Sequence, residues 1–258
     1  MNLLENFIKY SYYANFVDKD NTFSTLIVAP FESGKTFTLM KFKYDKAIVL
    51  SDVTYYGLQQ LLNDLNSGRY RVLVIPELIK IISRKSQFVN NFISLLNVLI
   101  EEGVKNVLTY NFRYEFEKPI KAGLLAAINQ DMFMRVYDYL QAIGFISRVI
   151  IFSYELSDNT INNIYNILKE GIKVKPLKLK SRFVNVEMSK KYDDLLIDLS
   201  KKIAKITFDK NYSFRIYRNL KLLLKGIALA NKKKAVDEND LAELEKLVPY
   251  INLSFNKI

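Results

Sequence analysis

The chain has 258 residues, half of them hydrophobic, so it can bury a sizeable core and is not globally disordered. It contains no cysteine and no histidine, which excludes disulfides, thiol nucleophiles, Ser-His triads and most zinc or iron ligation. The formal net charge is +11, with 18 Lys and Arg against 10 Asp and Glu in residues 176–258, and this excess indicates an anionic partner.

The first segment, residues 3–17, is expected to form an amphipathic helix. It has neither a basic stretch nor a small-residue cleavage site, so it does not have the features of a secretory signal. No apolar run in the chain approaches the ~18 residues typical of a membrane span. We therefore expect a soluble cytoplasmic protein that does not engage a membrane.

Five short apolar runs alternate with longer amphipathic stretches in the first 152 residues. Because the runs are almost continuously apolar, we expect parallel strands that are covered on both faces, in a three-layer α/β sheet. The expected strands are 25–29, 47–50, 71–75, 106–110 and 148–152, and the expected helices between them are 36–43, 56–66, 87–102 and 131–143.

The stretch VAPFESGKTF, residues 28–37, joins the first expected strand to the next helix. Gly34, Lys35 and Thr36 match the end of the motif G-x-x-x-x-G-K-[ST], whose backbone N–H groups surround phosphates, while the lysine reaches the β and γ oxygens and the hydroxyl ligates magnesium. Ala29 replaces the first glycine, which serves loop geometry, so a small residue is acceptable there. We expect ATP and Mg²⁺ as cofactors, and nucleotide contacts from Pro30, Phe31, Glu32, Ser33, Gly34, Lys35, Thr36 and Phe37.

The third expected strand, RVLVI, is followed by Pro76 and Glu77. A phosphate-loop enzyme needs a carboxylate at the end of a neighbouring strand to hold magnesium through water and to polarise the attacking water. A strand of this kind typically ends in Asp-Glu, and here one carboxylate is missing. Glu77 is therefore either the catalytic base, with Thr36 carrying the metal, or the magnesium-side group, with the base elsewhere.

The pattern changes around residues 173–180, which are basic and contain Pro176, so we expect a linker there. Ser213 is a candidate cap, and Asp237 with Asp240 resembles a capping box. The chain thus divides into an α/β core, residues 1–175, and an all-α domain, residues 176–258, with expected helices at 190–206, 213–231 and 237–249.

From the loop to the C-terminal helices, the chain resembles the AAA+ ATPases. The helical region SFRIYRNLKLLLKGIALANKKKAVDENDLAELEKL is similar to the lid of replication initiators and MCM helicases, with Val236 and Asp240-Leu241 opening its last helix. The stretch 121–148 also resembles small AAA+ proteins of archaeal viruses, phages or plasmids. The resemblance implies a P-loop core with a helical lid, located in the host cytoplasm if the source is viral.

The resemblance also implies three further catalytic positions. A polar "sensor 1" residue ends the family's fourth strand, and NVLTYN offers Asn111, with Thr109 as second choice. An arginine finger before the fifth strand reaches the neighbouring subunit's nucleotide, and Arg148 matches it, with Arg135 as rival. A "sensor 2" arginine near a lid helix start touches the γ-phosphate, and here it corresponds to Arg215 or the nearby Arg218.

The basic C-terminal region favours DNA as a largely non-specific partner. We expect a homo-oligomeric ATPase, with an arginine finger in trans and a replication protein as a candidate partner, that acts in replication initiation, helicase loading or unwinding. A nucleotide-dependent assembly switch with little turnover is the alternative that Pro76 and Glu77 favour. A DNA-packaging ATPase is a further alternative, which the lid argues against. The candidate DNA contacts are Lys178, Lys180, Arg182, Lys232, Lys233 and Lys234.

Overall fold

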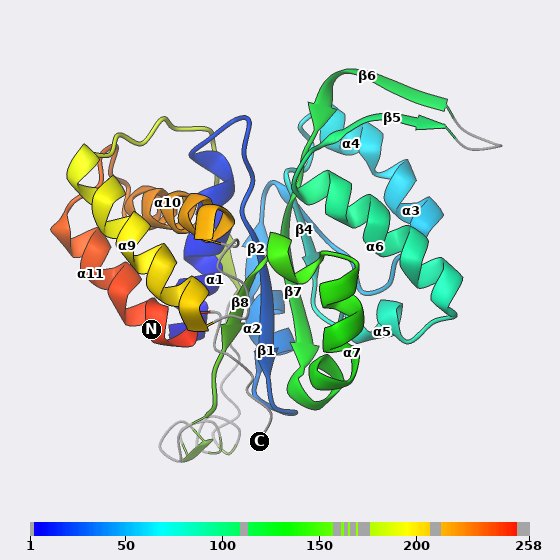
Figure 1. The fold of residues 1–258 in the computed structure, drawn as a ribbon, viewed down its shortest axis with the longest axis horizontal. Coiled ribbons are helices and arrows are strands. Elements are labelled where there is room, and N and C mark those ends of the chain that lie inside the picture. Colours follow the sequence, from blue (N-terminus) through cyan, green and yellow to red (C-terminus); the bar gives the residue numbers. More distant parts are fainter. Residues whose placement is uncertain are drawn as a thin grey trace.

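A five-stranded parallel sheet forms the centre of the protein (Figure 1). The computed structural model describes residues 3–108, 113–156, 176–206 and 213–251, together with residues 161, 162, 165 and 169. The strand order is β3-β4-β7-β1-β8, and every neighbouring pair is parallel. This arrangement confirms the predicted α/β class with a parallel sheet. The strands are β1 (Ser24–Ala29), β3 (Ala47–Val49), β4 (Val72–Ile75), β7 (Gly123–Asn129) and β8 (Ile150–Ser153).

Helices cover both faces of this sheet, because successive side chains of each buried strand point to opposite faces. Ile27 and Ala29 of β1 belong to a hydrophobic cluster with the N-terminal and C-terminal helices, whereas Leu26 and Val28 belong to a second cluster. On the first face lie α1 (Leu3–Tyr13), η1 (Ala14–Phe16) and α2 (Lys35–Lys41). The second cluster includes α3 (Tyr55–Gln60), α4 (Leu62–Asn66), α5 (Ile79–Ile82), α6 (Ser86–Ile100) and α7 (Gln130–Ala142).

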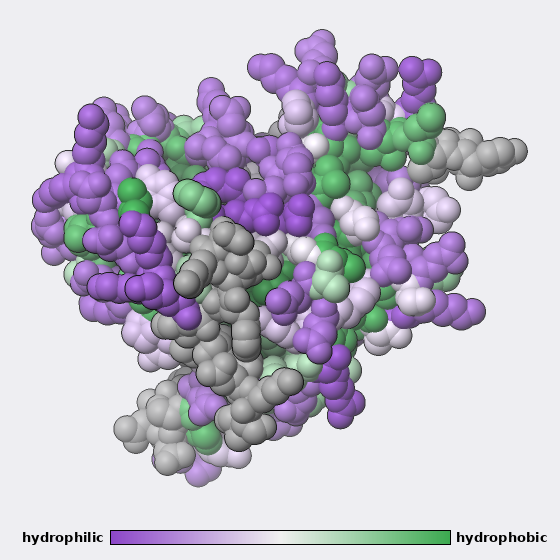
Figure 2. Space-filling model, in the orientation of Figure 1, coloured by the Kyte–Doolittle hydropathy of each residue, from purple (hydrophilic) through white to green (hydrophobic). Residues whose placement is uncertain are grey.

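A strand overlaps the predicted fourth strand, residues 106–110, but the prediction that it belongs to the parallel sheet is wrong. Here β5 (Val104–Leu108) pairs antiparallel with β6 (Arg113–Ile120) in a hairpin that projects from the body, with hydrophobic side chains beneath it toward α6 (Figures 1 and 2). The fourth strand of the sheet in chain order is β7, with the sequence GLLAAIN. All seven residues of β7 are buried, whereas only Val104 is buried in β5, so the more completely apolar segment occupies the sheet.

The three C-terminal helices are confirmed as α9 (Lys190–Ile206), α10 (Ser213–Ala230) and α11 (Glu238–Leu247), followed by η4 (Val248–Tyr250). The predicted capping box is present at the start of α11. The Asp237 carboxylate accepts hydrogen bonds from two backbone N–H groups of the first turn, and the Asp240 carboxylate accepts one from the Asp237 N–H. Within the parts of the chain that the structure describes, no helix combines the length and apolarity needed to cross a bilayer.

A short parallel ribbon of β2 (Phe42–Tyr44) and β9 (Leu177–Leu179) connects the expected linker to the first part of the chain. The helix α1 shares one hydrophobic cluster with α9, α10 and α11, and its Phe7 ring stacks on Phe152 of β8 with 3.9 Å between ring centroids. The division at residue 175 stays a prediction, but residues on its two sides pack into one common core.

Gly226 of α10 lies close to the backbone of α1 and η1. A Cβ atom added to Gly226 would lie 2.7 Å from the Ala14 nitrogen and 2.7 Å from the Tyr10 carbonyl oxygen. Both are backbone atoms, so neither can move aside without shifting a helix. The sequence therefore uses glycine in the middle of α10 although glycine disfavours helices.

We expect Gly226→Ala to destabilise the protein by about 1–3 kcal/mol, because overpacking outweighs the better helix propensity of alanine. Urea unfolding checks this. Gly57→Ala in α3 is the matched control, since its Cβ would make only ordinary contacts of 3.4 Å with side chains. A Gly226→Ala protein as stable as the Gly57→Ala protein would show that the two helices are not in close contact.

Candidate phosphate-binding site

The segment between β1 and α2 has the backbone shape of a tight loop. Glu32 (φ 56°) and Gly34 (φ 80°) both adopt left-handed conformations, which glycine tolerates without strain. The Gly34 carbonyl accepts hydrogen bonds of 2.8 Å from both the backbone N–H and the hydroxyl of Thr38, which fixes the start of α2. The Tyr154 hydroxyl, just after β8, donates to the Ser33 carbonyl at 2.9 Å. The predicted strand, loop and helix are therefore confirmed.

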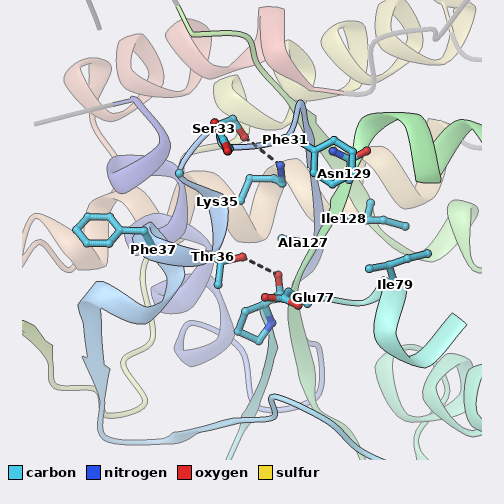
Figure 3. A pocket seen from close by; sticks show the side chains of 13 residues that line it. Phe31, Ser33, Lys35, Thr36, Phe37, Glu77, Ile79, Ala127, Ile128 and Asn129 are labelled. Atoms are coloured by element: carbon cyan, nitrogen blue, oxygen red, sulfur yellow. Dashed lines mark hydrogen bonds between the residues drawn. The ribbon is translucent and has the colours of Figure 1, made fainter. Parts of the chain in front are cut away.

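This loop forms one wall of a cavity of about 440 Å³ at the carboxyl end of the sheet (Figure 3). The other walls are the segment after β4 and the end of β7, so three separate parts of the sequence meet there. Seven of the eight expected nucleotide contacts line the cavity, and the eighth, Pro30, contributes a carbonyl beside it. The lining residues are Phe31, Glu32, Ser33, Gly34, Lys35, Thr36, Phe37, Pro76, Glu77, Ile79, Ala127, Ile128 and Asn129.

Lys35 is buried at the base of the loop. Its ammonium donates to the carbonyl oxygens of Ala29 (2.7 Å) and Pro30 (2.5 Å) and to the Ser33 hydroxyl (3.0 Å). Desolvation by burial lowers the pKa of Lys35 to about 8. Within the described part of the chain, Lys35 has no carboxylate in salt-bridge contact. The loop thus holds a cation that only neutral oxygens solvate.

The end of β4 lies opposite Thr36, whose hydroxyl donates to the Pro76 carbonyl at 3.4 Å (Figure 3). Pro76 therefore stands where a second carboxylate was expected. Glu77 lines the cavity, but 41% of its side chain is exposed, and it pairs with Lys80 at 2.7 Å. No group of three acidic side chains able to hold a metal occurs among the described residues. A magnesium ion here would depend on Thr36 and, through water, on Glu77.

Asn129, at the end of β7, is a site residue that the sequence analysis missed. Its Oδ1 caps α7 by accepting from the N–H groups of Asp131 (3.0 Å) and Met132 (3.4 Å). Its Nδ2 is buried without a hydrogen-bond partner in the described structure, and the residue lies beside Lys35 and Phe31 in the cavity (Figure 3). The usable signal is an unbroken apolar run, GLLAAIN, that ends in a helix-capping residue.

Asn129 takes the place expected for Asn111. Asn111 and its second choice, Thr109, lie outside the described residues, and the strand that leads to them belongs to the hairpin. In contrast, β7 lies in the sheet between β1 and β4. Its last residue, Asn129, is in register with Ala29, the last residue before the loop. The fourth strand of the sheet therefore does end in a polar residue, but in a different one.

Arg148 and Arg215 meet at the opposite edge of the sheet from the loop. Arg148, in η2 (Ile146–Arg148), pairs with Glu102 at 3.0 Å, and Arg215 donates to the hydroxyl of Ser147 at 2.8 Å. Ile150 is level with Thr25, the second residue of β1, and η2 ends two residues before Ile150, so Arg148 lies near the start of β1. Six strand residues, about 20 Å, separate that level from the loop. The structure does not bring Arg215 to the loop of its own chain.

Glu101 holds two arginines of α10 at this edge. It contacts Arg218 at 2.8 Å and Arg215 at 3.5 Å. Burial by itself would raise the pKa of the Glu101 carboxyl, but the Arg218 hydrogen bond and the nearby arginine charges hold it below its usual value. Figure 2 shows hydrophilic residues gathered on the surface between the C-terminal helices and the base of β6. These arginines therefore belong to an ion-pair network in the described structure.

The candidate DNA contacts divide into two kinds. Lys178, Lys180, Arg182, Lys232 and Lys234 are exposed. Lys233 is the exception, because it is already paired with carboxylates. Its ammonium donates to Asp237 at 2.6 Å and to the fully buried Asp240 at 3.1 Å. Lys233 thereby neutralises the two carboxylates of the capping box of α11.

The sequence matches no protein-family model, and a search of curated proteins finds no match either. The site is therefore defined by its own geometry: a strand–loop–helix with a buried lysine, a hydroxyl and an unpartnered amide around one cavity.

Proposed function

We propose that this chain binds ATP with Mg²⁺ in the cavity at the end of β1, hydrolyses it as an ATPase of the AAA+ kind, and acts on DNA. The observation that carries the proposal is the convergence of three donors on one cavity: the Lys35 ammonium, the Thr36 hydroxyl and the unpartnered Asn129 amide. Phosphate oxygens are the acceptors that suit such a set, since charged hydrogen bonds are the strongest ones.

Each residue then has a role at a stated atom. The Lys35 ammonium exchanges loop carbonyls for β- and γ-phosphate oxygens, and Asn129 Nδ2 donates to a phosphate oxygen. The Thr36 hydroxyl and, through water, Glu77 would hold Mg²⁺, which would neutralise part of the phosphate charge. The Glu77 carboxylate orients the attacking water and accepts its proton, which requires that Glu77 leave its ion pair with Lys80.

The edge that carries Arg148 and Arg215 supports an oligomer. Since about 20 Å of strand separates these arginines from the loop of their own chain, they can act only on a nucleotide bound to another copy. An arginine supplied in this way stabilises the charge that develops in phosphoryl transfer. The exposed basic residues of the linker support DNA as the partner, in replication initiation, helicase loading or unwinding.

The test measures binding of a fluorescent ATP analogue and release of phosphate, with and without DNA, at several protein concentrations. We expect DNA to stimulate turnover, and the activity per molecule to rise with protein concentration because the site needs two copies. Glu77→Gln should keep ATP binding and lose at least about 100-fold in turnover, as expected for a general base. Glu117→Gln, an exposed glutamate of the hairpin, is the control. A wild-type protein that binds no ATP would overturn the proposal.

A second candidate is a nucleotide-dependent assembly switch with little turnover. It is favoured by the carbonyl of Pro76 in the place of a carboxylate and by the ion pair that holds Glu77. In that case the protein binds ATP tightly, its oligomeric state depends on ATP, and Glu77→Gln has the same negligible turnover as the wild type. The same experiment therefore separates the two candidates.

A further inference from the structure

A line of cations runs along the ribbon of β2 and β9 and continues beyond it. Lys43 and Lys178 are directly paired in register, so two like charges lie side by side at exposed positions. Lys180 and Arg182 follow at two-residue spacing and are exposed too. Leu179, between Lys178 and Lys180, is buried. We call Lys43, Lys178, Lys180 and Arg182 the cationic ribbon. In the described residues, none of the four has a salt-bridge partner.

The geometry of the cationic ribbon suits a polyanion. Like charges that face each other across two strands destabilise the pair, and a bound anion would remove that repulsion. Cations two residues apart on an extended strand are about 6.6 Å apart. This spacing is comparable to that of successive phosphates along an extended nucleic-acid strand.

A cavity of about 470 Å³ opens where the cationic ribbon ends, and Phe183 is part of its wall. The Phe183 ring is supported from inside by the Arg71 guanidinium, 5.3 Å from the ring centroid, and by Phe16 at 5.7 Å between ring centroids. Arg71 itself is fixed by several backbone carbonyls, among them that of Lys19 at 2.9 Å. The ring is thus held in place while 44% of the residue remains exposed.

Polar groups in the wall of this cavity complement an anion and a base. The half-buried Lys225 of α10 and the exposed Lys19 contribute cations, and the exposed Asn185 contributes an amide with both donors and an acceptor. Desolvation, with the nearby charge of Lys221, lowers the pKa of Lys225. Asp18, which also lines the cavity, and Asp193 partly compensate the charge of Lys225, although neither is within salt-bridge distance of it.

We propose that the cationic ribbon and this cavity bind a single strand of nucleic acid, whose phosphates follow the ribbon while one base stacks on Phe183 beside Asn185. A base can reach an aromatic ring in this way only when it is unstacked, which favours a single strand over a duplex. The inference rests on the proposed function only in taking nucleic acid as the partner.

The experiment measures the fluorescence anisotropy of a labelled 15-nucleotide DNA strand, without ATP, as the full-length protein is added. We expect Phe183→Ala to weaken binding by about 5- to 150-fold, the value of one base stacked on an aromatic ring. Phe214→Ala is the matched control, because Phe214 is 81% exposed at the start of α10, away from this cavity, and should leave the affinity unchanged.

A salt titration tests the cationic ribbon separately. Replacing Lys178, Lys180 and Arg182 together by glutamine should reduce the slope of log Kd against log salt by about 2, since each phosphate contact to a single strand contributes about 0.7. The control replaces Lys201, Lys202 and Lys205, exposed lysines on α9, and should retain the wild-type slope.

Comparison ligands decide between this site and weaker alternatives. A single RNA strand that binds and responds to Phe183→Ala supports the site as DNA does. If duplex DNA or heparin binds as tightly as the single strand and Phe183→Ala changes nothing, the ribbon is a general anion surface and the proposal is overturned. ATP-analogue binding is measured on the same variants. Loss of strand binding with intact ATP binding removes only this inference, whereas intact strand binding by a protein that binds no ATP removes only the proposed function.

Discussion

Lys35→Met is expected to weaken ATP binding by about 10- to 150-fold, which corresponds to the loss of a hydrogen bond from a charged donor. Methionine keeps the length and apolar body of the lysine but cannot donate to a phosphate. The variant should nevertheless fold as stably as the wild type, or more stably. The reason is that the lysine charge is buried against neutral oxygens, an environment that disfavours the ammonium form.

The predicted effect of Lys35 on stability depends on pH in a definite direction. The folded-state pKa of Lys35 is about 8, against 10.5 in the absence of the fold, so the unfolded chain binds more protons between these values. The contribution of Lys35 to the free energy of unfolding must therefore rise as the pH rises from about 8 to 10.5. The shift corresponds to at most on the order of 3 kcal/mol.

Urea unfolding of the wild type and Lys35→Met at pH 7 and pH 9.5 checks this effect. The difference in stability between the two proteins should shrink or reverse at the higher pH, and Lys201→Met, at an exposed lysine of α9, should show no such change. A Lys35→Met protein that is clearly less stable than the wild type at pH 7 would mean that the ammonium stabilises the loop. Unchanged ATP affinity would mean that Lys35 does not contact phosphate.

Asn129→Asp is expected to reduce ATP turnover by about 100- to 1000-fold, the effect of removing one positioned donor from a site where charge develops. The aspartate retains an oxygen that can cap α7, so helix stability should be preserved. What it loses is the unpartnered Nδ2 donor, and it adds a negative charge beside the phosphates. Affinity for ATP should fall more than affinity for ADP, because the γ-phosphate carries the additional charge.

Phosphate release and the ratio of ATP to ADP affinity measure the effect of Asn129→Asp, and the thermal midpoint shows that the fold is intact. Asn129→Ala serves as the comparison, since it removes both the donor and the cap and should also destabilise the protein by about 1 kcal/mol. If Asn129→Asp turns over ATP like the wild type, the role of Asn129 ends with capping α7.

The parts of the fold that depend on neighbouring residues were predictable. The loop could be located because its strand, glycine, lysine and helix lie within about 18 residues, and the last helix because Asp237 and Asp240 form a local capping box. In each case the partners lie within a few residues, so the sequence alone contains the geometry.

The parts that depend on tertiary contacts were not predictable. GLLAAIN is rich in leucine and alanine, which favour helices, yet it forms the central strand β7 because burial on both faces outweighs propensity. Because this strand was missed, Asn129 was overlooked and the polar residue at the end of the fourth strand was predicted to be Asn111, which lies outside the described residues. Likewise, Arg215 and Arg218 pair with Glu101, more than 100 positions earlier in the chain, and nothing local indicates that contact.

The shared core of α1 and the C-terminal helices has a mechanical consequence. Because Gly226 lets α10 sit directly on the backbone of α1, a rotation of α9, α10 and α11 must carry α1 with it. The Phe7 ring would then slide against Phe152, the residue of the edge strand two positions before Tyr154, which holds the Ser33 carbonyl of the loop. In the described residues, a continuous set of contacts through α1 and β8 therefore connects the C-terminal helices to the loop.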